Sequence, residues 1–291
     1  MLAIYKKEMQ GYFTSMIAYL FLAAFVVLVG IYFVYYCVGY SLTDFTGYVL
    51  PSTCTWLGLL VPIITMRLWS EERKQKTDQL LLTLPLSVWD IVISVVKIVI
   101  GKYLAVLSLF VIALVIIMLY PFMLHFYGDV EWTTVALGMF GYFLIGAALI
   151  AVGFFISSLT ENQIVSAVVT AVLIFASFFL NNISNNLPGR ARYSIIFYAC
   201  VVVAVMILFY VSTKKVLPSV VSGIVGAGAI ALVYFIKPSM YDDGLSKVID
   251  WFSMMERYTN SFINGLLDVS AVVYYLSFAG VFLFLTVHMI E

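Results

Sequence analysis

The strongest constraint on this chain is a series of apolar runs, each about as long as a membrane is thick. A helix needs about 20 apolar residues to cross the hydrocarbon layer. Only 10% of the 291 residues are charged, whereas soluble domains carry about 25%. The sequence therefore predicts an all-α polytopic membrane protein, with a single transmembrane domain over residues 1–291.

The apolar runs define eight expected spans. Because the number is even, both termini are expected on the same side. The segments on that side carry ten of the 15 Lys and Arg residues, so the positive-inside rule assigns them to the cytoplasm. The expected spans are Met16–Val38, Val49–Leu68, Ile91–Tyr120, Thr133–Ser157, Ile164–Leu180, Tyr193–Val211, Val216–Ile236 and Ala271–His288.

The densest run of charge, Ser70–Asp78, lies between the second and third expected spans and has six charged residues in nine. At mid-bilayer each charge would cost about 2.5–3.5 kcal/mol, so the segment is expected in water on the cytoplasmic side. Ser70 is a candidate N-cap, with Glu71 and Glu72 in the first turn, where acidic residues complement the helix dipole. Pro62, in the preceding span, is expected to kink it.

A short amphipathic helix is expected next. Thr77 is its candidate cap, and Pro85 should end it because the residue before a proline avoids helical geometry. It is expected to expose three leucines on the cytoplasmic side, Leu80, Leu81 and Leu84. They could rest on lipid headgroups or fill a groove on a soluble partner, and the pattern alone does not separate these readings.

Two further segments are expected outside the bilayer. Residues 1–15 are expected to form an elbow helix on the inner membrane surface, because Met1–Gln10 have an apolar face and a separate polar, basic face. Within the extracytoplasmic segment 237–270, the stretch Ser246–Leu266 has a helical apolar stripe and is expected to be an amphipathic helix. It rests on the membrane or on the spans, and is a candidate surface for an extracytoplasmic accessory protein. The members of the stripe are Val248, Phe252, Met255, Phe262 and Leu266.

Other chemistry-bearing residues are sparse. Cys37, Cys54 and Cys200 have no metal-ligand spacing; a bridge between the first two is conceivable, but buried free thiols are favoured. His125 and His288 lie far apart in sequence, so no metal site is expected. A net charge of zero argues against a nucleic-acid partner.

Two lysines, Lys97 and Lys102, stand at the start of the third expected span. They are expected to snorkel to the inner interface, with a substrate or lipid-phosphate contact as the alternative. The stretch Gly101–Tyr103 reads "GKY" but lacks the rest of a phosphate-binding loop. The chain is therefore expected to be neither an ATPase nor another enzyme, and to hold no cofactor.

Three stretches resemble a known family. "RLWSEERKQKTDQLLLTLPLSVWDIV" (Arg67–Val92) is similar to the first coupling-helix region of type-2 ABC (ABC-2) exporter permeases, and more narrowly to the gliding-motility-associated (Gld-type) permease subunit. "SSLTENQIVSAV" (Ser157–Val168) is a shorter match. The third is "NSFINGLLDVSAVVYYLSFAGVFLFLT" (Asn260–Thr286). Because family members often have six spans, the expectation becomes six to eight, with an elbow helix and a cytoplasmic coupling helix in segment 69–86.

The resemblance implies a permease subunit in the cytoplasmic (inner) membrane of a bacterium. Its implied partners are an ABC ATPase dimer, which binds ATP and Mg²⁺, and a second permease, either another copy or a related chain. Membrane lipids surround it. The residues matching the ATPase-contacting segments are Glu71, Glu72, Arg73, Thr77, Leu80, Leu81 and Leu84 in the first, and Glu161, Asn162 and Gln163 in the second.

Other function classes remain open. A secondary carrier or channel would work without an ATPase, but carriers usually show acidic residues within their spans, and no clear mid-span Asp or Glu is found. A membrane-embedded enzyme would need paired His, Asp or Glu near one interface. Within the permease reading, the complex could move a solute or transmit force across the membrane. The sequence does not indicate a substrate.

Overall fold

The computed structural model describes residues 2–75, 88–186 and 251–290, with side chains over 2–73, 94–180 and 251–290. The described elements are all helical. The chain divides into two compact units, one formed by Met1–Phe178 with Met254–Glu291 and the other by Phe179–Ser253. All elements below lie in the first unit, apart from the end of the helix that begins at Gln163.

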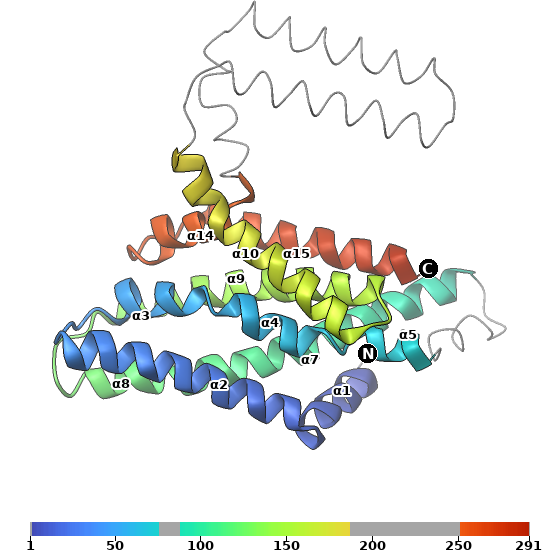
Figure 1. Ribbon diagram of the computed structural model, residues 1–291, viewed down its shortest axis with the longest axis horizontal. Coiled ribbons are helices and arrows are strands. Elements are labelled where there is room, and N and C mark those ends of the chain that lie inside the picture. The colour runs from blue at the N-terminus through green and yellow to red at the C-terminus, as the bar shows by residue number, and fades with distance from the viewer. Residues whose placement is uncertain (1, 76–87, 187–250, 291) are drawn as a thin grey trace, which may run out of the picture. The chain divides into compact units, whose positions relative to one another are not determined.

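Five helical stretches are long and apolar enough to cross a membrane, and a bent pair of helices would make a sixth. Six of the eight expected spans thus coincide with described helices, while Tyr193–Val211 and Val216–Ile236 lie outside the described residues. The elements (Figure 1) are α1 (Leu2–Thr14), α2 (Met16–Phe33), the π-helix η1 (Val34–Gly39), α3 (Phe45–Cys54), α4 (Leu57–Thr65), α5 (Ser70–Gln75), α7 (Val88–Ile117), α8 (Leu119–Leu124), α9 (Trp132–Leu159), α10 (Gln163–Asn186), α14 (Met254–Arg257), the π-helix η3 (Tyr258–Phe262) and α15 (Val269–Ile290).

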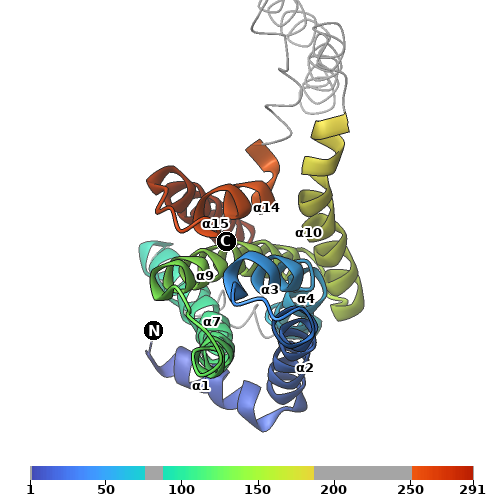
Figure 2. The ribbon, with the colours of Figure 1, turned by 90° about the vertical axis from the view of Figure 1, so that its left-hand side faces the viewer.

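The long helix α9 forms the centre of the first unit. It is 78% buried, against 22–44% for the other four long stretches, and α3, α4, α7 and α15 pack around it (Figure 2). Small residues permit this close packing. A methyl group at Gly146 would overlap the ring of Phe110 on α7, and one at Gly153 would overlap Thr65 on α4.

The second expected span is bent, but not where the sequence suggested. The bend of 54° lies between α3 and α4, at Thr55 and Trp56, while Pro62 is accommodated inside α4. The amides of Trp56 and Gly58 bond to carbonyls three residues back, which tightens the chain there. The indole Nε1 of Trp56 also donates to the Tyr32 hydroxyl on α2 at 2.9 Å, which holds the bend against its neighbour.

The polar run Asn181–Asn186 is the last part of α10. One other expectation needs correction. The helix expected over Ser246–Leu266 is not continuous. It is broken at Ser253, before α14 begins at Met254, and the chain turns at Gly265, where φ is +71°. The side chains of Met254, Tyr258 and Phe262 are buried, whereas Leu266 is 61% exposed. Of the other members of the expected stripe, Phe252 is exposed and Met255 is half-buried, while Val248 lies outside the described residues.

Candidate functional site

A buried lysine joins three elements at one end of the first unit. Lys102 of α7 is 3% exposed at its side chain, and its Nζ lies 2.8 Å from Glu72 Oε1 on α5 and 3.1 Å from Glu8 Oε1 on α1. It also donates to the Leu68 carbonyl at 3.0 Å. The ring of Trp69 lies 4.9 Å from Nζ, within the range of a cation–π contact. The ammonium group is therefore fully partnered despite its burial.

This arrangement corrects the expectation for Lys102. A snorkelling lysine extends its charge to the membrane surface, whereas Lys102 is turned inward to two carboxylates. Lys97, one and a half turns earlier, is exposed, as snorkelling requires. A lone lysine in an apolar run gives no sign of its partners, because Glu8 and Glu72 lie 94 and 30 residues away.

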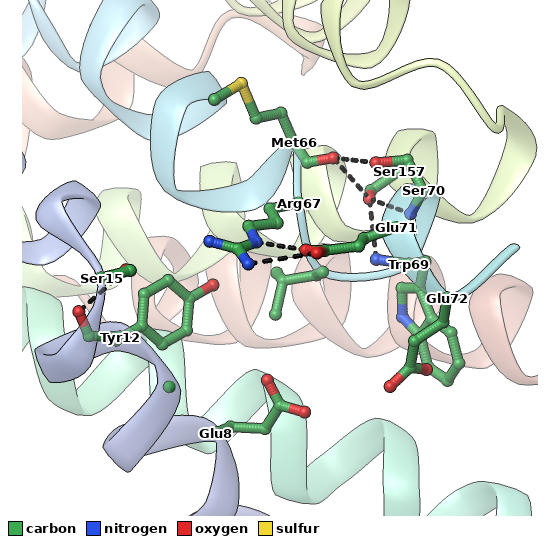
Figure 3. Close-up of polar contacts among 12 residues, drawn as sticks. Glu8, Tyr12, Ser15, Met66, Arg67, Trp69, Ser70, Glu71, Glu72 and Ser157 are labelled. Carbon is green, nitrogen blue, oxygen red and sulfur yellow. Dashed lines mark hydrogen bonds and ion pairs between the residues drawn. The ribbon is translucent and has the colours of Figure 1, made fainter. Parts of the chain in front are cut away.

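The start of α5 is held by a serine from another helix. The Ser157 hydroxyl of α9 accepts bonds from the Trp69 amide at 3.1 Å and the Ser70 amide at 3.3 Å, and donates to the Met66 carbonyl at 3.3 Å (Figure 3). Ser70 was expected to be the cap, but it is the first residue of α5, and its hydroxyl bonds to the Met66 carbonyl instead. Ser157 therefore satisfies two of the four amides that have no partner within the helix at its start.

Two further charges of α5, those of Glu71 and Arg73, also have partners within the chain. Arg67 binds both carboxylate oxygens of Glu71 (Figure 3), a pair partly open to solvent. Such exposed pairs contribute about 0–1 kcal/mol. The guanidinium of Arg73 donates to the Met289 carbonyl near the end of α15 at 3.5 Å. These contacts bring the end of α15 beside α5.

The N-terminal helix predicted for residues 1–15 is present as α1, and two tyrosines bind it to the other helices. Tyr5 donates to the Ser108 hydroxyl of α7 at 3.0 Å, and Tyr12 donates to the Ile64 carbonyl of α4 at 2.8 Å. Burial raises the pKa of the Tyr12 hydroxyl well above its ordinary value of 10, and the nearby Glu8 carboxylate raises it further. Tyr12 therefore stays protonated and keeps its bond at neutral pH.

The second predicted contact segment is the turn between α9 and α10. Glu161 and Asn162 are exposed and Gln163 is half-buried. The Asn162 side chain accepts a bond from the Ile164 amide at 2.9 Å and so caps α10. Because Ser157 lies two residues before the end of α9, the bonds from Ser157 to α5 place this turn beside the first segment.

The structure thus gathers some of the predicted contact residues and leaves others untested. Glu71, Glu72, Arg73 and the turn residues 161–163 lie at the same end of the unit. Glu71 and Glu72 were expected to contact a partner protein. In the structure each carboxylate is already paired with a basic residue of this chain, Glu71 with Arg67 and Glu72 with Lys102. Thr77, Leu80, Leu81 and Leu84 lie outside the described residues.

The described side chains offer no metal centre: no group of three or more His, Cys, Asp or Glu gathers among them. Cys37 and Cys54 are both buried and free, as favoured from sequence. The His125 ring packs edge-on against Trp132 at 5.6 Å, and His288 lies in the last turn of α15.

Comparison with models of known protein families, with curated proteins and with solved structures gives no match for this chain.

Proposed function

We propose that this chain is the membrane-spanning permease subunit of an ATP-driven, type-2 ABC exporter. In this proposal a separate ATPase dimer binds ATP and Mg²⁺. The cytoplasmic segments of the permease receive the motion of that dimer and pass it to the spans, either to export a substrate or to transmit force. A second permease, another copy or a related chain, completes the complex in a bacterial inner membrane.

One observation carries the proposal. Two segments 87 residues apart, which both resemble ATPase-contacting segments of the family, are joined by the bonds from Ser157 to the amides of Trp69 and Ser70. A partner that binds one segment would therefore meet the other. The chain has no phosphate-loop motif of its own, so the energy source would be another polypeptide.

The length of α7 suggests where the membrane surface lies. Its 30 residues span about 45 Å at about 1.5 Å per residue, whereas the hydrocarbon layer is about 30 Å thick. About ten residues at one end therefore project beyond the lipid. We place the Val88 end in the cytoplasm, which puts Lys97 at the inner surface and Lys102 about 7 Å inside it at about 1.5 Å per residue. It also puts α1 along that surface as an elbow helix, and both termini inside.

The proposed contact with the ATPase gives Glu71 and Glu72 a different role from the one expected from the sequence. Since Glu71 and Glu72 bind Arg67 and Lys102, they hold α5 in place and set its direction. The leucines Leu80, Leu81 and Leu84 then supply the apolar contact with the ATPase, and Glu161, Asn162 and Gln163 add a polar contact beside it.

The test is affinity capture of the ATPase subunit encoded nearest to this chain, after co-expression in membranes. The variant Leu80→Asp with Leu84→Asp should insert normally but lose the ATPase, because two carboxylates cannot enter an apolar groove. The matched control is Leu266→Asp with Leu267→Asp. These leucines are exposed and follow a turn beside Thr134, a full length of α9 from α5.

The control should retain the ATPase. Undiminished capture by the Leu80 and Leu84 variant, or no capture by the unaltered chain, would contradict the proposal.

A secondary carrier is the second candidate, and the bend between α3 and α4 favours it. Broken helices often form the binding sites of carriers, because they free backbone groups inside the membrane. Uptake or release by the chain alone in vesicles, driven by an ion gradient without ATP, would support this candidate over the permease.

A further inference from the structure

The helix α10 buries one narrow stripe of side chains against the rest of the first unit. It is the least buried of the five long stretches, at 22%. Its buried side chains stand four residues apart, and they are Ser166, Thr170, Ile174 and Phe178. The half of the stripe nearest the exposed turn at Glu161 and Asn162 is therefore polar, and the other half is apolar.

The hydroxyls of Ser166 and Thr170 have no partner in the part of the chain that the structure describes. Both side chains are 0% exposed, and neither Oγ atom makes a hydrogen bond there. A hydroxyl inside a helix can bond to a carbonyl one turn back, as Ser177 of the same helix does to Ile174 at 2.8 Å. Ser166 and Thr170 do not use this option, so their hydroxyls are directed elsewhere.

The Thr170 side chain points into the place where α10 meets α9 and α4. A methyl group at Gly153 of α9 would lie 3.1 Å from Cγ2 of Thr170, and it would overlap the hydroxyl of Thr65 on α4. Thr65 and Thr170 therefore converge on Gly153. The Thr65 hydroxyl donates its proton to the Val61 carbonyl at 2.9 Å, so its oxygen is still able to accept a bond.

The spacing of the two unpartnered hydroxyls suits one small bridging molecule. Residues four apart on a helix have Cβ atoms about 5–6 Å apart. A water molecule with two hydrogen bonds of about 2.8 Å spans that distance. Buried waters need two to four polar partners. Ser166 and Thr170 supply two of them, and the Thr65 oxygen is available as a third.

We propose that an ordered water molecule binds between Ser166 and Thr170, where α10 meets α9 and α4. The water bonds to both hydroxyls and satisfies two buried groups that would otherwise be costly to bury. It reaches the site from the exposed turn at Asn162, which is one helical turn before Ser166. The start of α10 is thus joined to the unit through water, whereas Ile174 and Phe178 join it through apolar contact. This inference does not rest on the proposed function.

The first test is a double-mutant cycle on the purified full chain in nanodiscs. Ser166→Ala and Thr170→Val each remove a hydroxyl and keep most of the side-chain volume. Each should lower the thermal unfolding midpoint, because a bond to water is lost. The double variant should lower it by less than the sum of the single shifts, because both hydroxyls bind the same water. The matched control, Ser166→Ala with Ser177→Ala, should be additive, because Ser177 bonds to its own helix.

The opposite signs would overturn the proposal. Small hydroxyl residues are common where membrane helices pack closely, and if Ser166 and Thr170 only fill space, alanine and valine would pack as well. Replacing an unpartnered buried hydroxyl with an apolar group is neutral or stabilising. Unchanged or raised midpoints in the single variants, or additive shifts in the double variant, would therefore exclude a shared water.

The second test needs no substitution. In solid-state NMR of the full chain in deuterated lipid bilayers, magnetisation is transferred from water to the labelled Ser and Thr side chains. The Cβ signals of Ser166 and Thr170 should build up several times faster than that of Ser177, which lies further along the same helix. Equal build-up at the three residues would refute the bound water. Neither test contains an ATPase, so their outcome is separate from that of the capture experiment.

Discussion

Replacing Ser157 with alanine should loosen the start of α5 without disturbing α9. The substitution removes the acceptor for two buried amides, those of Trp69 and Ser70. The Met66 carbonyl keeps its bond from the Ser70 hydroxyl, so only the two amides lose their partner. At about 1 kcal/mol for each net hydrogen bond, the loss is about 2 kcal/mol, which lies at the upper end for removal of a helix cap.

The assay is amide hydrogen exchange, read by mass spectrometry on peptides that cover residues 66–75. A loss of about 2 kcal/mol corresponds to about a 30-fold change in an equilibrium constant. The Trp69 and Ser70 amides should therefore exchange about 30-fold faster in Ser157→Ala, because exchange follows local opening. Peptides from the middle of α9 should be unchanged.

The neighbouring serine supplies a matched control. Ser158 is as fully buried as Ser157, but its hydroxyl bonds to the Phe155 carbonyl in its own helix at 2.6 Å. Ser158→Ala should leave the exchange of Trp69 and Ser70 within about threefold of the unaltered chain, the change expected for about 0.6 kcal/mol or less. Equal exchange in the two variants would refute the assignment of Ser157 as the cap of α5.

Two further predictions concern packing and pH. Gly146→Ala should lower the unfolding midpoint and reduce the free energy of unfolding by about 1–3 kcal/mol, because its methyl group would overlap the buried ring of Phe110. The control Gly280→Ala should leave the midpoint unchanged, because open space surrounds Gly280. Equal midpoints in the two variants would contradict the packing of Gly146 against Phe110. Tyr12→Phe should destabilise the chain by about 1 kcal/mol at pH 8 through the lost bond to Ile64. Burial raises the pKa of Tyr12 above its ordinary value of 10. The contribution of Tyr12 to the free energy of unfolding is therefore fully present below about pH 10, and it declines above that pH by up to about 1.4 kcal/mol per pH unit. The stability difference between the two proteins should therefore close or change sign between pH 8 and pH 11. A constant difference in denaturant titrations would show that Tyr12 is not buried as described.

Hydropathy predicted most of the helices because the membrane acts locally on each stretch of chain. An apolar run of sufficient length must be helical in lipid whatever its neighbours are, so α2, α7, α9, α10 and α15 follow from composition alone. The bend at Thr55 and Trp56 does not, because one of the hydrogen bonds that hold it runs from Trp56 to Tyr32 of a different helix. Pro62 was the residue from which a kink was expected, but it lies inside the continuous helix α4.

The sequence drew attention to two segments of the candidate site but not to their contacts. Charge alone led to the expectation that Ser70–Asp78 lies in water, of which the structure describes Ser70–Gln75, and Ser157–Val168 was selected by resemblance. The capping pattern at Ser70 was assigned wrongly because the amides at the start of α5 are satisfied by Ser157, 87 residues away in sequence. Local rules find caps only when the acceptor is local.

Lys102 shows most clearly what the sequence determines and what only the tertiary structure decides. The sequence determined that a charged residue in an apolar run must find water or a counter-ion, since an unpaired charge in lipid is too costly. It also determined the membrane class of the protein and the order of most of the described helices. Only the tertiary structure decided that Lys102 turns inward to Glu8 and Glu72. That choice depends on the packing of α1 and α5 against α7, which no local pattern encodes.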